Sequence, residues 1–167
     1  DLATTSHVTL DGLIQAWNDV AASSTTGQQS DLQSGATGGS FAGSSSAGDG
    51  CNEPCHLVAT NTTDLTVGGG AFIEADNVTL AAQMVSTNLK DYNRSNGDGA
   101  FEDSDATSDV NLTSTVHVQL NAPAKIVGHQ SVTITAQHQK LDVFAQARAT
   151  CGCFGGDSDA HARSHFT

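Results

Sequence analysis

Residues 116–137, which read VHVQLNAPAKIVGHQSVTITAQ, decide the fold class of this chain. Apolar and polar residues alternate from Val116 to Leu120 and again from Val132 to Ala136. A period of two places one set of side chains in an interior and the other in water, which is the pattern of a β-strand. Each run is short and is interrupted by Asn, Pro or Gly, so the sequence predicts short strands and almost no helix.

The same pattern occurs twice more, clearly in residues 64–83 and more weakly in residues 7–24. Within the three blocks, Ile14, Ile73 and Ile126 hold equivalent places, so that neighbouring blocks are 59 and 53 residues apart. This regularity predicts a sequence repeat with one isoleucine at the same position of each unit.

A second marker supports the same spacing. The Asp-Ser-Asp-Ala sequence at residues 103–106 recurs at residues 157–160, 54 residues later. The two markers divide the chain, which we take as one domain, into three degenerate repeats of about residues 7–60, 61–114 and 115–167. We expect the chain to be a segment of a longer fibre, because the repeats begin and end abruptly.

Short strands with one apolar face must stack on neighbours to bury that face, and stacked coils also pair their backbones at about 4.8 Å per coil. The predicted fold is therefore all-β, a parallel β-helix (β-solenoid) of stacked short strands. Each repeat is expected to hold two or three coils of about 20 residues, which gives about eight coils in the chain. An antiparallel β-sandwich is the alternative, since it also consists of short alternating strands. The predicted core residues are Ile14, Val20, Ile73, Val78, Ile126 and Val132.

Residues 23–50 interrupt this pattern, because they are rich in Ser, Gly, Thr and Gln and contain only Leu32 and Phe41 as large apolar residues. We expect them to form a long polar loop or a loosely wound coil. Residues 84–109 and 138–162 occupy the same place in the later repeats, so the prediction is a variable polar excursion from each unit.

The charge balance excludes several kinds of partner. Six Lys and Arg against 18 Asp and Glu give a formal net charge of −12, which repels nucleic acid and anionic membrane surfaces. No stretch approaches the roughly 20 apolar residues that span a bilayer, so no membrane insertion is expected. Divalent cations are the natural counter-charge.

The blocks at residues 64–83 and 116–137 resemble the β-helical repeat region of giant bacterial surface adhesins and haemagglutinin-like exoproteins. The shared phrase is apolar-x-apolar, a small loop, Ile-x-Ala or Ile-x-Gly, and then a strand such as Asn-Val-Thr-Leu-x-Ala. The resemblance implies an extracellular or cell-surface fibre, without catalytic activity, that stacks end to end with flanking repeats or with its own copies. The four cysteines depart from the family, whose members are usually poor in cysteine.

These cysteines form two close pairs, Cys51 with Cys55 and Cys151 with Cys153. Four cysteines allow three connectivities, and disulfides are the default in an extracellular protein. We expect a Cys51–Cys55 staple within one loop. A bond between Cys151 and Cys153 would be strained, so these two are expected to meet a neighbouring coil or subunit.

Two metal or cofactor hypotheses involve the first cysteine pair. Cys51, Cys55 and His56 resemble a variant of the c-type haem attachment motif with one extra residue between the thiols. The chain lacks the aromatic and Met residues that wrap haem, and multihaem filaments carry such motifs more densely, so haem is disfavoured. Zinc is disfavoured as well, because no second Cys-x-x-Cys accompanies the pair.

Acidic residues near the end of the second repeat are the stronger metal candidate, because clustered oxygens in a glycine-containing loop suit calcium. The alternative is a solvated acidic turn that only aids solubility. The candidate calcium residues are Asp98, Glu102, Asp103, Asp105 and Asp109, with Asp157 and Asp159 in the third repeat.

No catalytic signature occurs in the sequence: it contains no Gly-x-Ser-x-Gly, no His-Glu-x-x-His and no phosphate loop. The sequence therefore predicts a structural or adhesive fibre segment and no enzyme. The alternative is a surface protein loaded with calcium or haem, and a carbohydrate-acting β-helix enzyme is the least favoured reading.

Overall fold

The computed structural model describes residues 1–39, 41–47 and 56–167, and in this part of the chain the regular structure consists of strands. No helix long and apolar enough to cross a membrane occurs among these residues. The ten strands are β1 (Leu2–Leu10), β2 (Leu13–Gln15), β3 (Asp19–Gly38), β4 (Ala42–Ala47), β5 (His56–Val67), β6 (Phe72–Gly97), β7 (Phe101–Leu120), β8 (Lys125–His138), β9 (Leu141–Cys151) and β10 (Ser158–Phe166).

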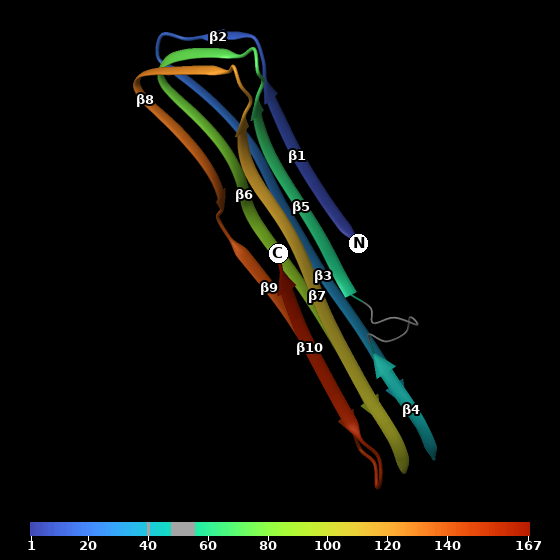
Figure 1. The fold of residues 1–167 in the computed structure, drawn as a ribbon. Helices are drawn as coiled ribbons and strands as arrows, with labels where there is room; N and C mark the ends of the chain where they lie inside the picture. The colour runs from blue at the N-terminus through green and yellow to red at the C-terminus, as the bar shows by residue number, and fades with distance from the viewer. Residues whose placement is uncertain (40, 48–55) are drawn as a thin grey trace.

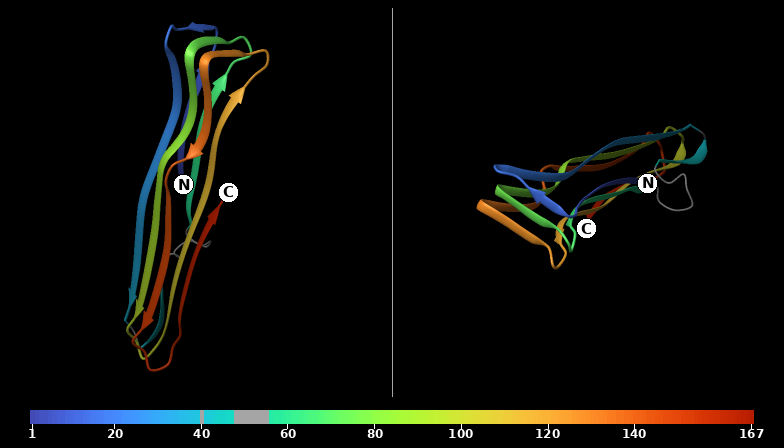
Figure 2. Two further views of the ribbon diagram at one scale, coloured as in Figure 1. Left: turned by 90° about the vertical axis from the view of Figure 1, so that its left-hand side faces the viewer. Right: turned by 90° about the horizontal axis from the view of Figure 1, so that it is seen from above.

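The strands form two five-stranded sheets that run along one long axis (Figure 1). The first sheet contains β1, β4, β5, β7 and β10, and the second contains β2, β3, β6, β8 and β9. The chain passes from one sheet to the other near the two ends of the molecule, so that it runs in turn along the first sheet and the second (Figure 2). The fold is therefore all-β, with two sheets of long strands facing each other.

Every strand pairing in these sheets is parallel. The antiparallel sandwich that the sequence left open is therefore wrong. The register aligns the repeat: Ile14 pairs with Ile73, and Ile73 pairs with Ile126. In the first sheet Asp105 pairs with Asp159, so the second sequence marker is also in register.

The size of one unit differs from the prediction. Each repeat makes one pass along each sheet, and paired residues such as Val8 and Leu65 or Leu65 and Val118 are 53 to 59 positions apart in the chain. The expectation of coils of about 20 residues is therefore wrong. The physical reason is strand length, because β6 alone continues for 26 residues, far beyond its apolar segment.

The predicted polar loop at residues 23–50 is also largely strand. β3 extends to Gly38, paired in parallel with β6, and β4 follows at Ala42. Ser24 and Thr26 point inward and are buried, because alternation continues through this polar segment with hydroxyls in place of methyl groups. Residues 84–109 and 138–162 likewise lie mainly in β6, β7, β9 and β10.

The space between the sheets has an apolar zone near the end that carries β2. Ile73 and Val78 of the middle repeat are fully buried there, and Ile14, Val20 and Ile126 of the outer repeats are partly buried against them. Val132 pairs with Val78 but is 45% exposed, because β8 has no further strand over it among the described residues. The middle repeat is thus sealed by the repeats on both sides, whereas each outer repeat has one open side.

Towards the other end the interior is polar. Ser95 of β6 lies between Ser45 and Ser104 of the first sheet, with oxygen–oxygen distances of 3.0 and 2.9 Å. Ser108 donates a hydrogen bond of 2.7 Å across the interior to the carboxylate of Asp91. Side-chain hydrogen bonds therefore join the two sheets beside a second, smaller apolar cluster. Its buried members are Leu57, Ala59, Leu89, Val110 and Leu112.

The corners between the sheets are stacked at the end that carries β2 (Figure 1). Gly12 has a φ of 78° at the first corner, a left-handed conformation that favours glycine over residues with a Cβ. Its carbonyl accepts a hydrogen bond of 2.9 Å from Phe72 N, and Lys125 N donates to Ala71 O at 2.9 Å. Three successive repeats are thereby held in register at the corner where a pocket opens.

Candidate functional site

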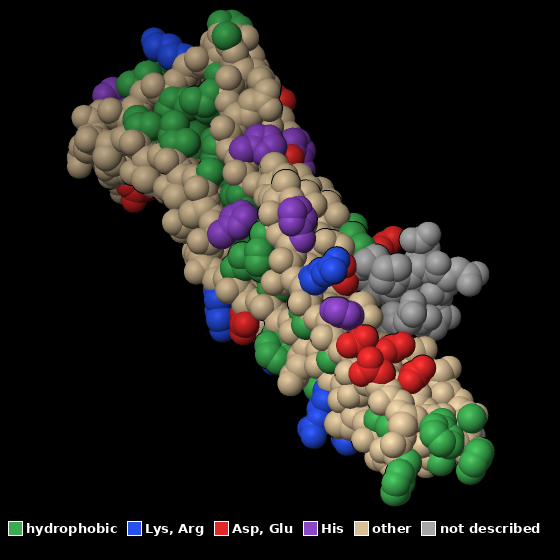
Figure 3. Space-filling model, turned by 60° about the horizontal axis from the view of Figure 1, so that its bottom comes forward, with side chains coloured by type: hydrophobic (Ala, Val, Ile, Leu, Met, Phe, Trp, Pro, Cys, Tyr) green, Lys and Arg blue, Asp and Glu red, His purple; other side chains and the backbone are tan. Residues whose placement is uncertain are grey.

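Four of the predicted calcium ligands lie together on the outer face of the first sheet. Asp103 and Asp105 of β7 are exposed, and Asp105 pairs with Asp159 of β10. Asp157 N donates a hydrogen bond of 3.1 Å to Asp103 Oδ1, which brings the two acidic segments side by side. Figure 3 shows acidic side chains gathered towards one end of a molecular face along which histidines are also distributed.

The other predicted ligands do not join them. Glu102 points between the sheets and is only 2% exposed, since it alternates with Asp103 along β7. Its Oε2 accepts a hydrogen bond of 3.0 Å from Asp98 N, and a Cβ on Gly38 would overlap its Oε1. Asp109 lies further along β7 and is half-buried. Across the described ranges, no three His, Cys, Asp or Glu side chains converge as a metal site.

The cysteines divide into one described and one undescribed pair. Cys151 and Cys153 are joined as a disulfide, with Cα atoms 5.3 Å apart, within the range of about 4.4–6.8 Å that disulfides adopt. The expectation that these two thiols meet a neighbouring coil or subunit therefore differs from the structure, which closes a local loop. Cys51 and Cys55 lie outside the described residues, and with them the loop staple and the haem motif that includes His56.

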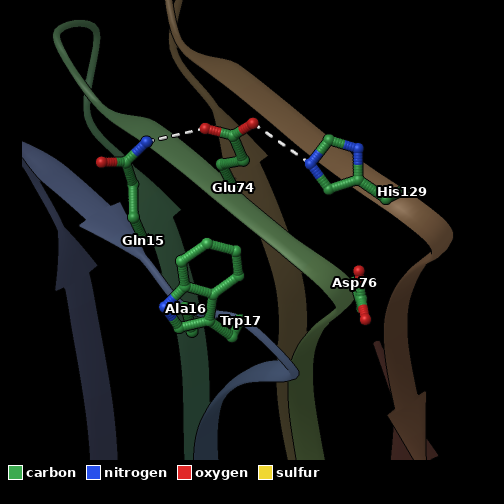
Figure 4. Close-up of a pocket in the computed structure, with 6 residues that line it drawn as sticks. All are labelled: Gln15, Ala16, Trp17, Glu74, Asp76 and His129. Carbon is green, nitrogen blue, oxygen red and sulfur yellow. Dashed lines mark hydrogen bonds and ion pairs between the residues drawn. The ribbon is translucent and has the colours of Figure 1, made fainter.

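A pocket of about 390 Å³ opens at the stacked corners, on the outside of the second sheet (Figure 4). Its lining comes from all three repeats, because β2, β6 and β8 begin at the same corner. Trp17 lies in the turn after β2 and its side chain is 95% exposed. The lining residues are Gln15, Ala16, Trp17, Glu74, Asp76 and His129.

Glu74 is the fixed centre of this pocket. Gln15 Nε2 donates a hydrogen bond of 2.7 Å to Glu74 Oε2, and His129 Nε2 lies 3.1 Å from Glu74 Oε1 (Figure 4). The hydrogen bond from Gln15 lowers the pKa of the Glu74 carboxyl, and the contact with His129 acts in the same direction. Partners on both sides thus hold Glu74 as an oriented carboxylate at neutral pH.

Further hydrogen bonds order the rim beside it. Gln130 Nε2 donates to Asp76 Oδ2 at 3.3 Å, and Asn77 Nδ2 donates to Asp19 Oδ1 at 2.9 Å. Ser131 then donates to Asn77 Oδ1 at 2.7 Å. These contacts again join adjacent repeats, so the polar groups around the pocket are preorganised by the stacking itself.

Histidine–aspartate contacts run across the first sheet as well. Asp64 of the middle repeat pairs with His7 on one side and with His117 on the other. His117 Nδ1 lies 3.0 Å from Asp64 Oδ1, and His7 Nδ1 lies 4.0 Å from Asp64 Oδ2. The two imidazoles are each about half exposed, so this arrangement is a surface ladder that links three repeats.

Asp91 is an ionisable group inside the polar interior. Burial raises the pKa of its carboxyl, and the nearby charge of Asp109 adds to the rise. Hydrogen bonds from Ser108 and Asn93 oppose it. These contacts hold Asp91, which is 5% exposed, in the space between the two sheets.

The sequence analysis did not predict the pocket, because it counted Trp17 in the amino-acid composition and assigned it no position in the repeat. A usable signal was present, since the alignment of Ile14 with Ile73 places Gln15 beside Glu74. The alignment also leaves Trp17 without an aromatic equivalent in the later repeats. The chain matches no protein-family model, no curated protein and no solved structure.

Proposed function

We propose that the chain is a segment of a parallel β-solenoid that serves as a structural and adhesive part of an extracellular fibre or cell-surface filament, without catalytic activity. The observation that carries this proposal is the difference in side-chain burial between the middle and the third repeat. Val78 and Leu80 of the middle repeat are fully buried, while their register partners Val132 and Ile134 are each 45% exposed.

Half-open apolar columns and unpaired strand edges are templates for further stacking. β8 and β9 have β6 as a parallel partner on one side, and the described residues provide no strand on the other. A further coil, from a flanking repeat or from a second copy, would continue both the backbone ladder and the columns. Stacking of this kind builds a filament whose stability grows with each added unit.

The remaining features support a surface location and an adhesive role. Only 14% of residues are charged and the outer faces are mainly Ser, Thr, Asn and Gln, which suits a long solvated stalk. The Cys151–Cys153 disulfide fits an oxidising compartment. The adhesive part of the proposal comes from the resemblance of residues 64–83 and 116–137 to surface-adhesin repeats.

Calcium loading is a second candidate function, and one observation favours it. Asp105 and Asp159 are register neighbours, and Asp157 lies against Asp103, so four carboxylates of two repeats share one outer surface. A cation there would offset their mutual repulsion and join the two repeats.

The stacking proposal is tested by a pair of adjacent lysine substitutions. Val132→Lys places a charge in the open apolar column, where a further coil would have to cover it. Thr133→Lys adds the same charge one residue away, on the opposite face of β8, and serves as the control.

The solution mass of each protein is measured by light scattering over a concentration series, with electron microscopy for filaments and circular dichroism for folding. The parent and Thr133→Lys are expected to exceed the 17.0 kDa of a monomer as concentration rises, and Val132→Lys is expected to remain monomeric. A parent that stays at 17.0 kDa without filaments, or equal loss of association in both variants, would overturn the proposal.

A further inference from the structure

Trp17 is the one tryptophan of the chain, and its side chain is 95% exposed. Tryptophan normally buries about 150–250 Å² of surface in a core or interface, so an indole that remains in water forgoes the favourable free energy of burying its apolar surface. The Trp17 ring adjoins a pocket whose other polar groups are already fixed by hydrogen bonds (Figure 4). This combination is typical of a binding site whose ligand supplies the missing cover.

We propose that the Trp17 pocket binds a neutral saccharide, with the apolar face of one sugar ring stacked on the indole of Trp17. The sugar hydroxyls would donate to the carboxylates of Glu74 and Asp76 and accept from the amide of Gln15. The inference deepens the proposed adhesive function and rests on it, since it names the class of surface ligand that the fibre segment recognises.

The lining chemistry favours hydroxyl groups. A carboxylate accepts about four hydrogen bonds, and Glu74 uses one oxygen for Gln15 and the other for His129. Both oxygens keep lone pairs for further donors, and their positions are held from both sides. A pyranose ring presents axial C–H groups on one face and hydroxyls around its edge. The C–H face can stack on the indole of Trp17 while the hydroxyls donate to the carboxylate oxygens beside it.

Charge favours a neutral sugar over an acidic one. Glu74 and Asp76 both line the pocket, and the whole chain carries a formal charge of −12. An acidic saccharide would meet repulsion from both carboxylates. A cationic ligand above the indole is the competing chemistry, and the titration with tetramethylammonium tests it. Glu74 and Asp76 already accept hydrogen bonds from the neutral amides of Gln15 and Gln130, so uncharged donors suit this corner.

Stacking also sets the number of sites. Gln15, Glu74 and His129 come from three successive repeats, so the pocket forms only when these are in register. Trp17 has no aromatic equivalent in the second and third repeats. One site is therefore expected on each chain.

Because Trp17 is the only tryptophan, its fluorescence reports on this pocket alone. The parent is titrated with tetrasaccharides of glucose, mannose and N-acetylglucosamine, and separately with tetramethylammonium chloride. At least one neutral tetrasaccharide is expected to change the emission with a dissociation constant of about 1 mM or tighter and one site per chain.

Calorimetry with that tetrasaccharide then compares variants. Trp17→Ala is expected to weaken binding on the order of tenfold or more, and Trp17→Phe to keep part of the affinity because it keeps an aromatic face. Phe154→Ala is the matched control, since Phe154 is fully exposed in the turn between β9 and β10. Figure 1 shows that this turn lies at the end of the molecule opposite β2.

Absence of binding by all three tetrasaccharides, equal binding by the parent and Trp17→Ala, or binding of tetramethylammonium alone would overturn the saccharide assignment. Circular dichroism separates this failure from failure of the stacked fold. If the parent protein is folded but binds no sugar, only the saccharide proposal is wrong. If the parent protein has no β-structure, the fibre proposal is contradicted as well.

Discussion

Val78→Ala and Val132→Ala form a matched pair of substitutions that measures how much side-chain burial stabilises the middle and the third repeat. The two valines are register partners in one column, but Val78 is fully buried and Val132 is 45% exposed. Both substitutions delete the same two carbons from a strand, so the difference in strand propensity between valine and alanine largely cancels in the comparison. What remains is the burial of each side chain.

The expected magnitudes follow from that burial. Removing two buried carbon groups costs about 1.6 kcal/mol at roughly 0.8 kcal/mol each, and a residual cavity between the neighbouring valines adds to this. We therefore expect Val78→Ala to lower the free energy of unfolding by about 2–3 kcal/mol. Val132 has nearly half its surface in water and its deletion leaves no closed cavity, so about 0.8 kcal/mol is expected.

The assay is urea unfolding followed by far-UV circular dichroism, at a concentration where the parent has the 17.0 kDa mass of a monomer. Unchanged m-values show that the difference lies in the folded state. Equal losses in the two variants, or a larger loss for Val132→Ala, would refute the claim that the third repeat is open on one side. At concentrations where chains stack, the loss for Val132→Ala should rise towards that of Val78→Ala.

The remaining predictions concern charge. Because burial raises the pKa of Asp91 above the ordinary 3.8, the folded chain holds this proton to higher pH than the unfolded chain, so stability falls as pH rises through the raised value. Asp91→Asn keeps the acceptor for Ser108 and should raise the urea midpoint at pH 7 while leaving it unchanged near pH 3; identical pH profiles for parent and variant would contradict this. Millimolar calcium should raise the melting temperature relative to excess chelator through Asp103, Asp105 and Asp159, and Asp105→Asn should reduce that rise. If the melting curves in calcium and in chelator are the same, calcium does not bind there and the carboxylates form only a solvated acidic surface.

The strands and their register were accessible from sequence because both signals are local. Alternation from Val132 to Ala136 depends on neighbouring residues only, and the equivalence of Ile14, Ile73 and Ile126 follows from comparing short blocks. The structure pairs these isoleucines directly. Parallel pairing then follows, since repeats that run in the same direction align residue with residue.

Strand length was not accessible in the same way. A binary apolar–polar pattern ends where the apolar side chains end, so the sequence predicts a polar excursion over residues 84–109. In the structure β6 continues to Gly97, because inward hydroxyls and amides find partners on the facing sheet. Ser95 reaches Ser45, which is 50 residues away in the chain, and no property of residues 84–97 alone reveals that contact.

The candidate sites show the same limit. Glu102 is close to Asp103 and Asp105 in sequence, but alternation along β7 places its side chain on the opposite face of the strand. The pocket at Trp17 depends instead on residues 15, 74 and 129, which only the stacked register brings together. Functional residues of a repeat array are therefore better sought across equivalent positions than along the chain.

The polar interior also explains how long, degenerate repeats keep one register. An apolar column tolerates a slip of two residues, because each strand still presents an apolar face to the core. The hydroxyls of Ser95 and Ser108 do not, since a slip would leave buried donors and acceptors without partners at about 1–3 kcal/mol each. The apolar end therefore supplies much of the driving force for stacking, and the polar end selects the one alignment that also assembles Gln15, Glu74 and His129 around the pocket.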